Sequence, residues 1–244
     1  MSTSTDTHAD TRSRRMAALY QGDREIRASA PSPAAIEAAR HPGLRLPQVI
    51  QTIVEAYADR PALGRRATTV ERDPATGRSE HRLLPEFETT TYGQLWADVR
   101  AIAAAWSSDD VPVRPGDFVT TIGFASADYL TVDLVCGYLG LVAVPLQHNS
   151  PASRLRPIFD ETEPAVLATS AAYLDLAIES ALGSSSVRRL VVFDYDDRVD
   201  DHREALARAK TALGDTPVTV ELLADVVTRG RDLPAPTPFD GGDD

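Results

Sequence analysis

Residues 117–147, which read DFVTTIGFASADYLTVDLVCGYLGLVAVPLQ, restrict the fold of this chain more than any other stretch. Apolar runs at 118–124 and 141–146 flank apolar residues that recur at helical spacing, with Asp128 and Asp133 on the opposite face. A strand, a helix and a strand of these lengths form a βαβ unit with parallel strands and a right-handed crossover. The continuous apolar character of 141–146 is typical of a strand covered by helices on both sheet faces. We therefore predict an α/β fold.

Short apolar strands continue to alternate with amphipathic helices as far as residue 220. The further elements that this pattern predicts are strands at 165–168, 190–193 and 218–220, and helices at 151–161, 171–182, 200–213 and 222–229. Regular alternation of this kind predicts a doubly wound, mostly parallel sheet.

The part of the chain before residue 117 has a different pattern. Residues 1–11 are rich in Ser, Thr and Asp, and we expect them to be disordered. Short β-prone pieces on either side of a turn at 73–77 predict a small antiparallel meander. The expected helices are 12–26, 34–40, 46–58 and 92–106, the last with Thr91 as its N-cap.

Charge and cysteine content exclude several classes of function. The 244 residues carry a net charge of −11, which is opposite to the basic patch that nucleic-acid binding requires. No apolar run approaches the roughly 20 residues that span a bilayer, and residues 1–15 lack the apolar core of a secretory signal. The single cysteine, Cys136, lies on the apolar face of the central helix and is expected to act as a small buried hydrophobe. We predict a cytoplasmic protein with no nucleic-acid or membrane partner.

Most motifs that carry chemistry are absent from the sequence. There is no phosphate-binding P-loop, H-E-x-x-H, C-x-x-C or G-x-S-x-G, and the turn at 123–128 lacks the glycines of a dinucleotide site. The acidic run 194–201, DYDDRVDD, lacks the glycine and the terminal Glu of a calcium loop, so we expect a solvated loop and helix N-cap. The histidines occur at no metal-ligand spacing and are expected to be ordinary surface or loop residues: His8, His41, His81, His148 and His202.

Gln147 and His148 have the best positional argument for a site. They follow the predicted strand 141–146, which we expect to be a central strand, and α/β sheets place ligands at the carboxyl ends of such strands. The alternative is that they belong to a plain connecting loop.

Two stretches resemble the core motifs of adenylate-forming enzymes, the superfamily of acyl-CoA synthetases, luciferases and peptide-synthetase adenylation domains. TTYGQL at 90–95 resembles the first motif, and GYLGLVAVPL at 137–146 resembles the second, with RPGD at 114–117 between them. The segments that more narrowly resemble the N-terminal region of actinobacterial carboxylic acid reductases are YADRPALG at 57–64, DPATGR at 73–78, VPLQ at 144–147 and RRLVVFDY at 188–195. One departure is QHNSP at 147–151, where smaller residues are expected after the glutamine.

This resemblance implies a three-part enzyme. An adenylation domain activates a carboxylic acid with ATP and Mg²⁺ to an acyl-adenylate, a carrier phosphopantetheine thiol takes the acyl group, and a reductase domain uses NADPH to release an aldehyde. The family's phosphate loop, nucleotide-binding motifs and catalytic lysine are expected beyond residue 244. No catalytic, cofactor-binding or metal-binding residue is therefore assigned to this chain, which we expect to be an inactive N-terminal portion that binds no cofactor by itself.

The resemblance also predicts how the chain is organised. We expect a disordered or helical extension at 1–30, the incomplete N-terminal subdomain of an adenylation domain at 31–232, and a connector at 233–244. The carboxylic acid would bind through the remainder of the domain. Two alternatives stay open: part of a standalone acyl-CoA or acyl-AMP ligase, and a non-catalytic α/β binding module.

Overall fold

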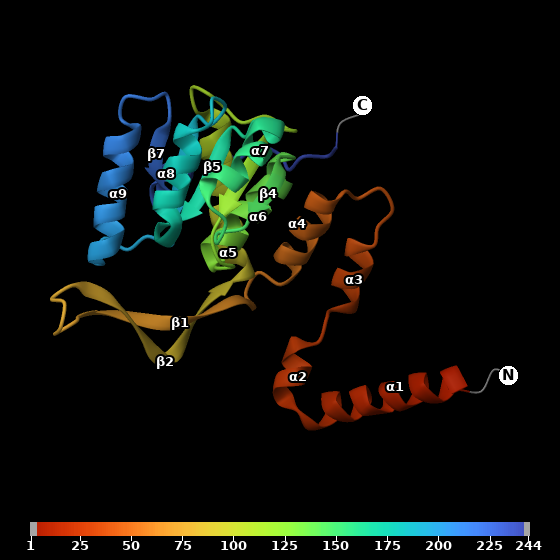
Figure 1. Ribbon diagram of the computed structural model, residues 1–244. Helices are drawn as coiled ribbons and strands as arrows, with labels where there is room; N and C mark the ends of the chain where they lie inside the picture. The colour runs from red at the N-terminus through yellow and green to blue at the C-terminus, as the bar shows by residue number, and fades with distance from the viewer. Residues whose placement is uncertain (1–3, 242–244) are drawn as a thin grey trace. The chain divides into compact units, whose positions relative to one another are not determined.

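The computed structural model describes residues 4–241, and the chain divides into two compact units, 1–44 and 45–244 (Figure 1). Each unit is described by itself.

The first unit is helical. It contains α1 (Ser4–Gly22), α2 (Arg24–Ser29) and α3 (Pro33–Ala39). Asp23 caps α2 by accepting the backbone N–H of Glu25 at 2.8 Å, and Ser32 caps α3. The disorder expected at 1–11 is wrong from Ser4 onward, because no proline or glycine interrupts the backbone hydrogen bonds of α1 before its last residue. Residues 1–3 lie outside the described part.

The second unit contains a parallel sheet. Within the described residues its strands are β3 (Phe118–Ile122), β4 (Val142–Leu146), β5 (Val166–Ser170), β6 (Arg189–Phe193) and β7 (Thr219–Leu222). They pair in the order β4-β3-β5-β6-β7, and every pair is parallel. The predicted α/β fold with a parallel sheet is confirmed.

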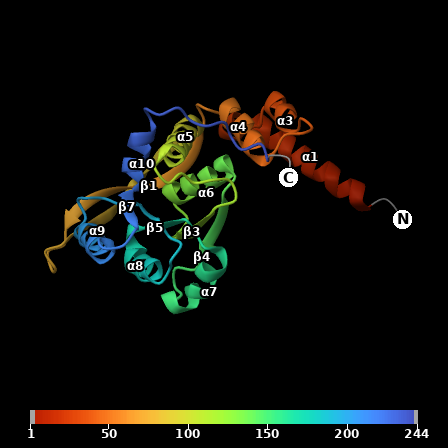
Figure 2. The same ribbon diagram turned by 90° about the horizontal axis from the view of Figure 1, so that it is seen from above.

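Helices cover both faces of this sheet, as Figure 2 shows. One face carries α4 (Leu46–Ala56), α5 (Tyr92–Ser108), α6 (Ala127–Leu139) and α10 (Leu223–Gly230). The other carries α7 (Ala152–Thr162), α8 (Leu174–Leu182), which follows a short 3₁₀ turn at Ala171–Tyr173, and α9 (Asp200–Leu213). The apolar core is therefore split into two layers by the sheet, as in a doubly wound fold.

Local sequence explains where the central helices begin and end. Thr91 is the N-cap of α5 and forms a capping box with Gln94, each side chain bonding the other residue's backbone N–H. Ser126 caps α6, which ends at Gly140 in the left-handed conformation, with φ of 70°. The predicted cap of α5 is confirmed.

The position of β4 differs from the prediction. It lies at the edge of the sheet, and no described strand pairs with its outer side. Val142 in β4 is 41% exposed, whereas every residue of β5 and β6 is buried. The expectation of a central strand covered on both faces is therefore wrong, since an apolar sequence shows that a strand prefers burial but not which neighbours it has.

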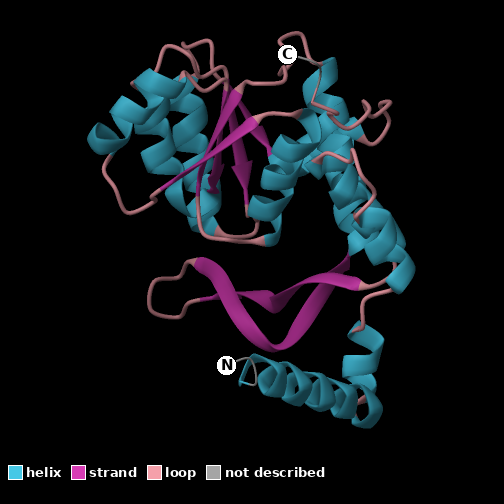
Figure 3. Ribbon diagram, turned by 90° about the vertical axis from the view of Figure 1, so that its right-hand side faces the viewer, coloured by secondary structure: helices cyan, strands magenta, loops and turns pink. Residues whose placement is uncertain are grey.

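The antiparallel part consists of β1 (Pro61–Arg72) and β2 (Ser79–Thr91), which form one long hairpin (Figure 3). The predicted turn at its tip is confirmed, with Asp73 accepting the backbone N–H of Ala75 at 2.7 Å. The expected meander of short pieces is instead a pair of long strands with irregular register after Pro61 and after Arg66. These irregularities interrupt the alternating pattern on which the prediction depended.

The last described residues cross the end of α6. The Tyr138 hydroxyl donates to the carbonyl of Pro236 at 2.6 Å, and the Phe239 N–H donates to the carbonyl of Tyr138 at 2.8 Å. The Phe239 carbonyl accepts from Gln48 in α4. The Phe239 ring packs so closely against Gly140 that a Cβ on residue 140 would lie 2.5 Å from the ring.

Candidate functional site

The strand order identifies the carboxyl ends of the parallel strands, called the carboxyl edge below, as the place for a site. The helix after β3, α6, lies on one face, whereas the helix after the neighbouring strand β5, α8, lies on the other. In open α/β sheets this reversal leaves a crevice outside the carboxyl ends of the strands, and ligands bind there. The loops that follow β3, β4 and β5 are therefore the first candidates.

These three loops bring three aromatic rings together. Phe124 follows β3, His148 follows β4 and Tyr173 follows β5. The ring centroids of Phe124 and His148 are 4.2 Å apart, and those of His148 and Tyr173 are 4.7 Å apart. Phe124 is 63% exposed, so the cluster offers an apolar aromatic surface with one imidazole at the crevice. Such a surface suits contact with a flat or apolar group.

Of the two sequence candidates, His148 is brought into this cluster, and Gln147 lies beside it as an exposed residue. Both follow the carboxyl end of β4, as predicted, although β4 is an edge strand. Sequence reasoning missed Phe124 and Tyr173. The available signal was that Phe124 ends the apolar run 118–124 and that Tyr173 lies near the start of the helix 171–182, which follows another predicted strand.

A second feature of the same edge is a cavity of about 630 Å³ between the hairpin and the body of the unit. The hairpin contributes Arg65, Arg66, Thr68 and His81 to its lining. The opposite wall comes from residues after the carboxyl ends of the strands, including Asp128, the segment 194–198, and Leu222 at the end of β7. The wall is dominated by charged groups of both signs.

Asp194 has the most unusual backbone in this cavity. Its φ is 52°, a left-handed conformation that only a few per cent of non-glycine residues adopt. The backbone N–H of Asp194 donates to the carboxylate of Asp128 at 2.9 Å. Burial raises the pKa of the Asp194 carboxyl to about 6, and the Asp128 charge adds to this, while a hydrogen bond from Ser126 opposes it.

The acidic run 194–201 does not behave entirely as predicted. The N-cap of α9 is Val199, so the run contains the N-cap position as predicted, but this apolar side chain makes no capping hydrogen bond. Asp196 instead accepts from Arg198 and pairs with His81, which hold its pKa below the usual range. Asp200 accepts the backbone N–H of Ser79 at 2.6 Å.

Among residues 4–241, no group of three or more acidic, His or Cys side chains could hold a metal ion.

Two histidines that are far apart in the sequence meet beside the cavity. The rings of His81 and His202 are 5.7 Å apart, and His202 Nδ1 accepts the backbone N–H of Asp196. Burial lowers the pKa of His202, and the neighbouring His81 lowers it further. No sequence pattern predicted this pair, because its members come from the hairpin and from α9.

Cys136 is buried in α6, as predicted. Burial raises the pKa of its thiol to about 12, and Asp133 adds to the effect. A thiol with this pKa is protonated at neutral pH and is a poor nucleophile, so Cys136 is a packing residue.

The amino edge of the sheet holds a buried ionic network that the sequence did not indicate. Arg189 lies between Asp109, at 2.6 Å, and Glu221, at 3.1 Å, and Arg229 contacts both acids. Arg189 Nη1 and the indole N–H of Trp106 have no hydrogen-bond partner among the described residues. This network ties β6 and β7 to the end of α5 and to α10, so we assign it a structural role.

Comparison with known proteins decides the family. The model of the AMP-binding enzyme family matches residues 54–237, which is most of the chain. The chain belongs to the AMP-binding enzyme family. None of the helices in the described part of this AMP-binding protein is long and apolar enough to cross a membrane.

The chain is also similar to named members of this family. It is 46% identical over 231 residues to a carboxylic acid reductase of Mycobacterium tuberculosis, and 43% identical over 236 residues to one of Segniliparus rugosus. These alignments cover 95% and 94% of the chain but 20% of each relative. The AMP-binding chain therefore spans about a fifth of the length of the curated relatives it matches.

Solved structures agree with the sequence comparison. The adenylation–carrier didomain of the Segniliparus rugosus reductase, determined with AMP, matches with a TM-score of 0.87 at 42% identity, over 92% of this chain and 32% of that one. The adenylation domain of a Mycobacterium chelonae carboxylate reductase matches with a TM-score of 0.86 at 40% identity, over 94% of this chain and 36% of that one. The predicted resemblance to the reductases and the predicted fold class are both confirmed.

Proposed function

We propose that this chain is the N-terminal part of the adenylation domain of an ATP- and NADPH-dependent carboxylic acid reductase. In the whole enzyme a carboxylic acid would be converted to an acyl-adenylate, then to a carrier thioester, then to an aldehyde. The observation that carries the proposal is the 46% identity to a carboxylic acid reductase over 95% of the chain.

The ligands of the related structures support an acid-activating role. The Segniliparus rugosus adenylation domain was determined with AMP and a co-purified carboxylic acid. In this chain, the carboxyl edge with its exposed Phe124 and neighbouring His148 is the surface that we expect to face the substrate side of the domain.

The residues of this chain do not by themselves fit ATP or Mg²⁺. The sequence contains no glycine-rich phosphate loop, and residues 4–241 contain no cluster of metal-ligating side chains. Binding of ATP, Mg²⁺, phosphopantetheine and NADPH is therefore assigned to other parts of the whole enzyme. That no residue of this chain is catalytic, that it has no nucleic-acid partner and that it is cytoplasmic all stay predictions from the sequence.

A carrier-protein ligase is the second candidate. The chain is 30% identical over 129 residues to an L-proline–carrier protein ligase of Streptomyces coelicolor, which covers 52% of the chain. The reductases align over almost twice that share at higher identity, so we prefer the reductase.

A domain exchange tests the proposal. We would replace the matching 236 residues of the Segniliparus rugosus reductase with this chain and measure acid-dependent ATP–pyrophosphate exchange and aldehyde formation. Both activities are expected to persist. Matched controls are the unmodified reductase and the same exchange made in the Streptomyces ligase.

The separated chain supplies the negative arm of the experiment. We expect no ATP–pyrophosphate exchange above background from residues 1–244 with any carboxylic acid. Exchange by this polypeptide would contradict the assignment of ATP binding to other parts. A folded chimera that is inactive in the reductase but active in the ligase would favour the second candidate.

A further inference from the structure

The hairpin of β1 and β2 has little apolar attachment to the rest of its unit. Of residues 61–91, all of which the structure describes, Ala67 alone is buried. Two large apolar side chains of β2, Leu83 and Phe87, are 62% and 68% exposed. Apolar burial therefore contributes little to holding the hairpin in place.

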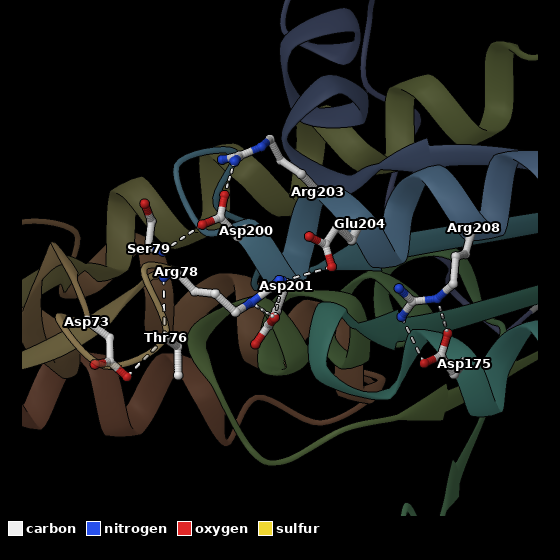
Figure 4. A network of polar contacts seen from close by, with 10 residues as sticks. All are labelled: Asp73, Thr76, Arg78, Ser79, Asp175, Asp200, Asp201, Arg203, Glu204 and Arg208. Atoms are coloured by element: carbon white, nitrogen blue, oxygen red, sulfur yellow. Dashed lines mark hydrogen bonds and ion pairs between the residues drawn. The ribbon is translucent and has the colours of Figure 1, made fainter.

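The distal half of the hairpin is attached by polar contacts instead, and most of them are drawn in Figure 4. Arg78 donates to Asp201 at 2.5 Å and lies 2.8 Å from Glu204. The backbone N–H of Ser79 donates to Asp200 at 2.6 Å. His81 pairs with Asp196 at 2.8 Å.

All four acceptors belong to one short segment, 196–204, at the start of α9. The two acids that face Arg78 raise its pKa, so this guanidinium is charged throughout the usual pH range. We call the contacts of Arg78, Ser79 and His81 with this segment the latch. The latch is partly exposed, with 39% of the Arg78 side chain and 78% of the Asp201 side chain accessible.

The closed hairpin covers the carboxyl edge of the sheet. Residues on its inner side line the cavity of about 630 Å³, whose other wall follows the ends of β3, β6 and β7. The register of the hairpin is irregular between Pro61 and Leu63, next to its junction with α5, and again between Arg66 and Thr68, about halfway along β1. Irregular register locally weakens strand pairing and allows a ribbon to bend.

We propose that the hairpin Pro61–Thr91 is a hinged cover over the carboxyl edge, held closed by the latch and opened by its release. The hinge is the irregular region near Pro61 and Arg66, and β1 and β2 stay paired as the cover moves. Because the latch is ionic and partly exposed, salt screens it and shifts the equilibrium toward the open form. The inference rests on contacts within this chain and not on the proposed function.

Distances between two labels test the cover. Spin labels are placed at the exposed hairpin tip through Ala75→Cys and at the exposed side of α9 through Ala207→Cys, while buried Cys136 is replaced by Ala. Electron–electron double resonance then gives the distance distribution at about 0.05 M and about 1 M salt, where the screening length falls from above 10 Å to about 3 Å.

At low salt the labelled parent is expected to show mainly a short distance between the labels. At high salt the population at a longer distance is expected to increase several-fold. Arg78→Gln is expected to increase the open population about fivefold at low salt, as loss of an exposed ion pair does. The double substitution Asp201→Asn and Glu204→Gln removes the same contacts from the other side and is expected to act alike.

Arg208→Gln is the matched control. Arg208 lies on the same helix and forms a similar exposed pair with Asp175, at 2.9 Å, but the hairpin takes no part in it. Its distance distribution should equal that of the parent. A single unchanged distance in the latch variants at both salt concentrations, with circular dichroism showing folded protein, would overturn the proposal. Equal opening by Arg208→Gln would also overturn it.

Discussion

The parallel sheet and the hairpin are both β-structure within one unit, yet they are held by different forces. Every residue of β5 and β6 is buried between two helical layers. Most residues of β1 and β2 are exposed, and ion pairs fix the distal part of the hairpin. The sheet therefore depends on apolar burial, which is large and little affected by salt, whereas the hairpin depends on charges, which are weak and screened.

This difference predicts two kinds of response to substitution. Changes in the sheet should lower the free energy of unfolding of the whole unit. Changes that only remove exposed side chains of the hairpin should leave that free energy nearly unchanged and alter local position or salt dependence instead. Matched residues in the two regions allow the comparison to be tested.

The largest effect is expected for a pair of phenylalanines. Phe193 ends β6 and is 1% exposed, whereas Phe87 in β2 is 68% exposed. Phe193→Ala removes a buried ring and should lower the free energy of unfolding by about 3–5 kcal/mol, while Phe87→Ala should change it by less than about 0.5 kcal/mol. Urea denaturation followed by circular dichroism measures both. Similar losses in the two variants would show that the hairpin is packed more firmly than its exposure indicates.

A pair of glycines separates backbone strain from packing. Gly140 and Gly77 both have φ of 70°, so alanine meets a similar left-handed strain of about 1–2 kcal/mol at either position. At Gly140 the new Cβ would also lie 2.5 Å from the Phe239 ring, whereas at Gly77 the nearest atom is 3.7 Å away. Gly140→Ala should therefore be the more destabilising of the two by about 1–3 kcal/mol in the same urea assay.

The Phe239 ring gives this second prediction its own control. If Phe239→Ala removes most of the excess cost of Gly140→Ala in a double-mutant cycle, the clash is its cause. If the two glycine variants lose equal stability, residues 236–241 do not stay packed on α6 in solution.

The same contrast explains how much of the fold was predictable from the sequence. Helix α5 was predicted with Thr91 as its N-cap, because N-capping is a local interaction within the first turn of a helix. The buried strands β5 and β6 were found from their apolar runs. The hairpin was seen only as fragments, because strands exposed on both faces carry no strict apolar alternation. The place of β4 at the sheet edge depends on pairing between distant segments, which no local pattern records.

In the candidate site, too, features recorded in the local sequence could be predicted, whereas contacts between distant segments could not. His148 could be singled out because it follows a recognisable strand, but its contacts with Phe124 and Tyr173 come from loops after two other strands. Arg78 directly follows the turn predicted at 73–77, and its partners Asp201 and Glu204 lie more than 120 residues away. Charged contacts at such separation depend on the finished fold, so they could not be predicted before it.

The smallest effect is expected for two aspartates whose pKa values shift in opposite directions. Asp194 follows the carboxyl end of β6 and lines the cavity on the side of the sheet. Burial raises the pKa of its carboxyl to about 6 from an ordinary value of 3.8. Its contribution to stability is therefore present below pH 3.8 and is lost as pH rises through about 6. The carboxylate of Asp200 accepts a hydrogen bond from the backbone N–H of Ser79 in the hairpin, and this hydrogen bond lowers the pKa of Asp200. Its contribution is present above pH 3.8 and is lost only as pH falls below that value.

Asp194→Asn and Asp200→Asn should consequently differ in pH dependence. Relative to the parent, Asp194→Asn should gain stability between pH 5 and pH 8. In the parent the Asp194 carboxyl becomes charged over this range although its burial disfavours the charge, whereas asparagine stays neutral. The gain should stay below about 1 kcal/mol, since Asp194 keeps contact with solvent, and asparagine accepts the left-handed backbone. Asp200→Asn should differ from the parent by a constant amount over the same range. Urea midpoints at the two pH values decide this, and parallel pH profiles for both variants would contradict the assignment of the raised pKa to Asp194.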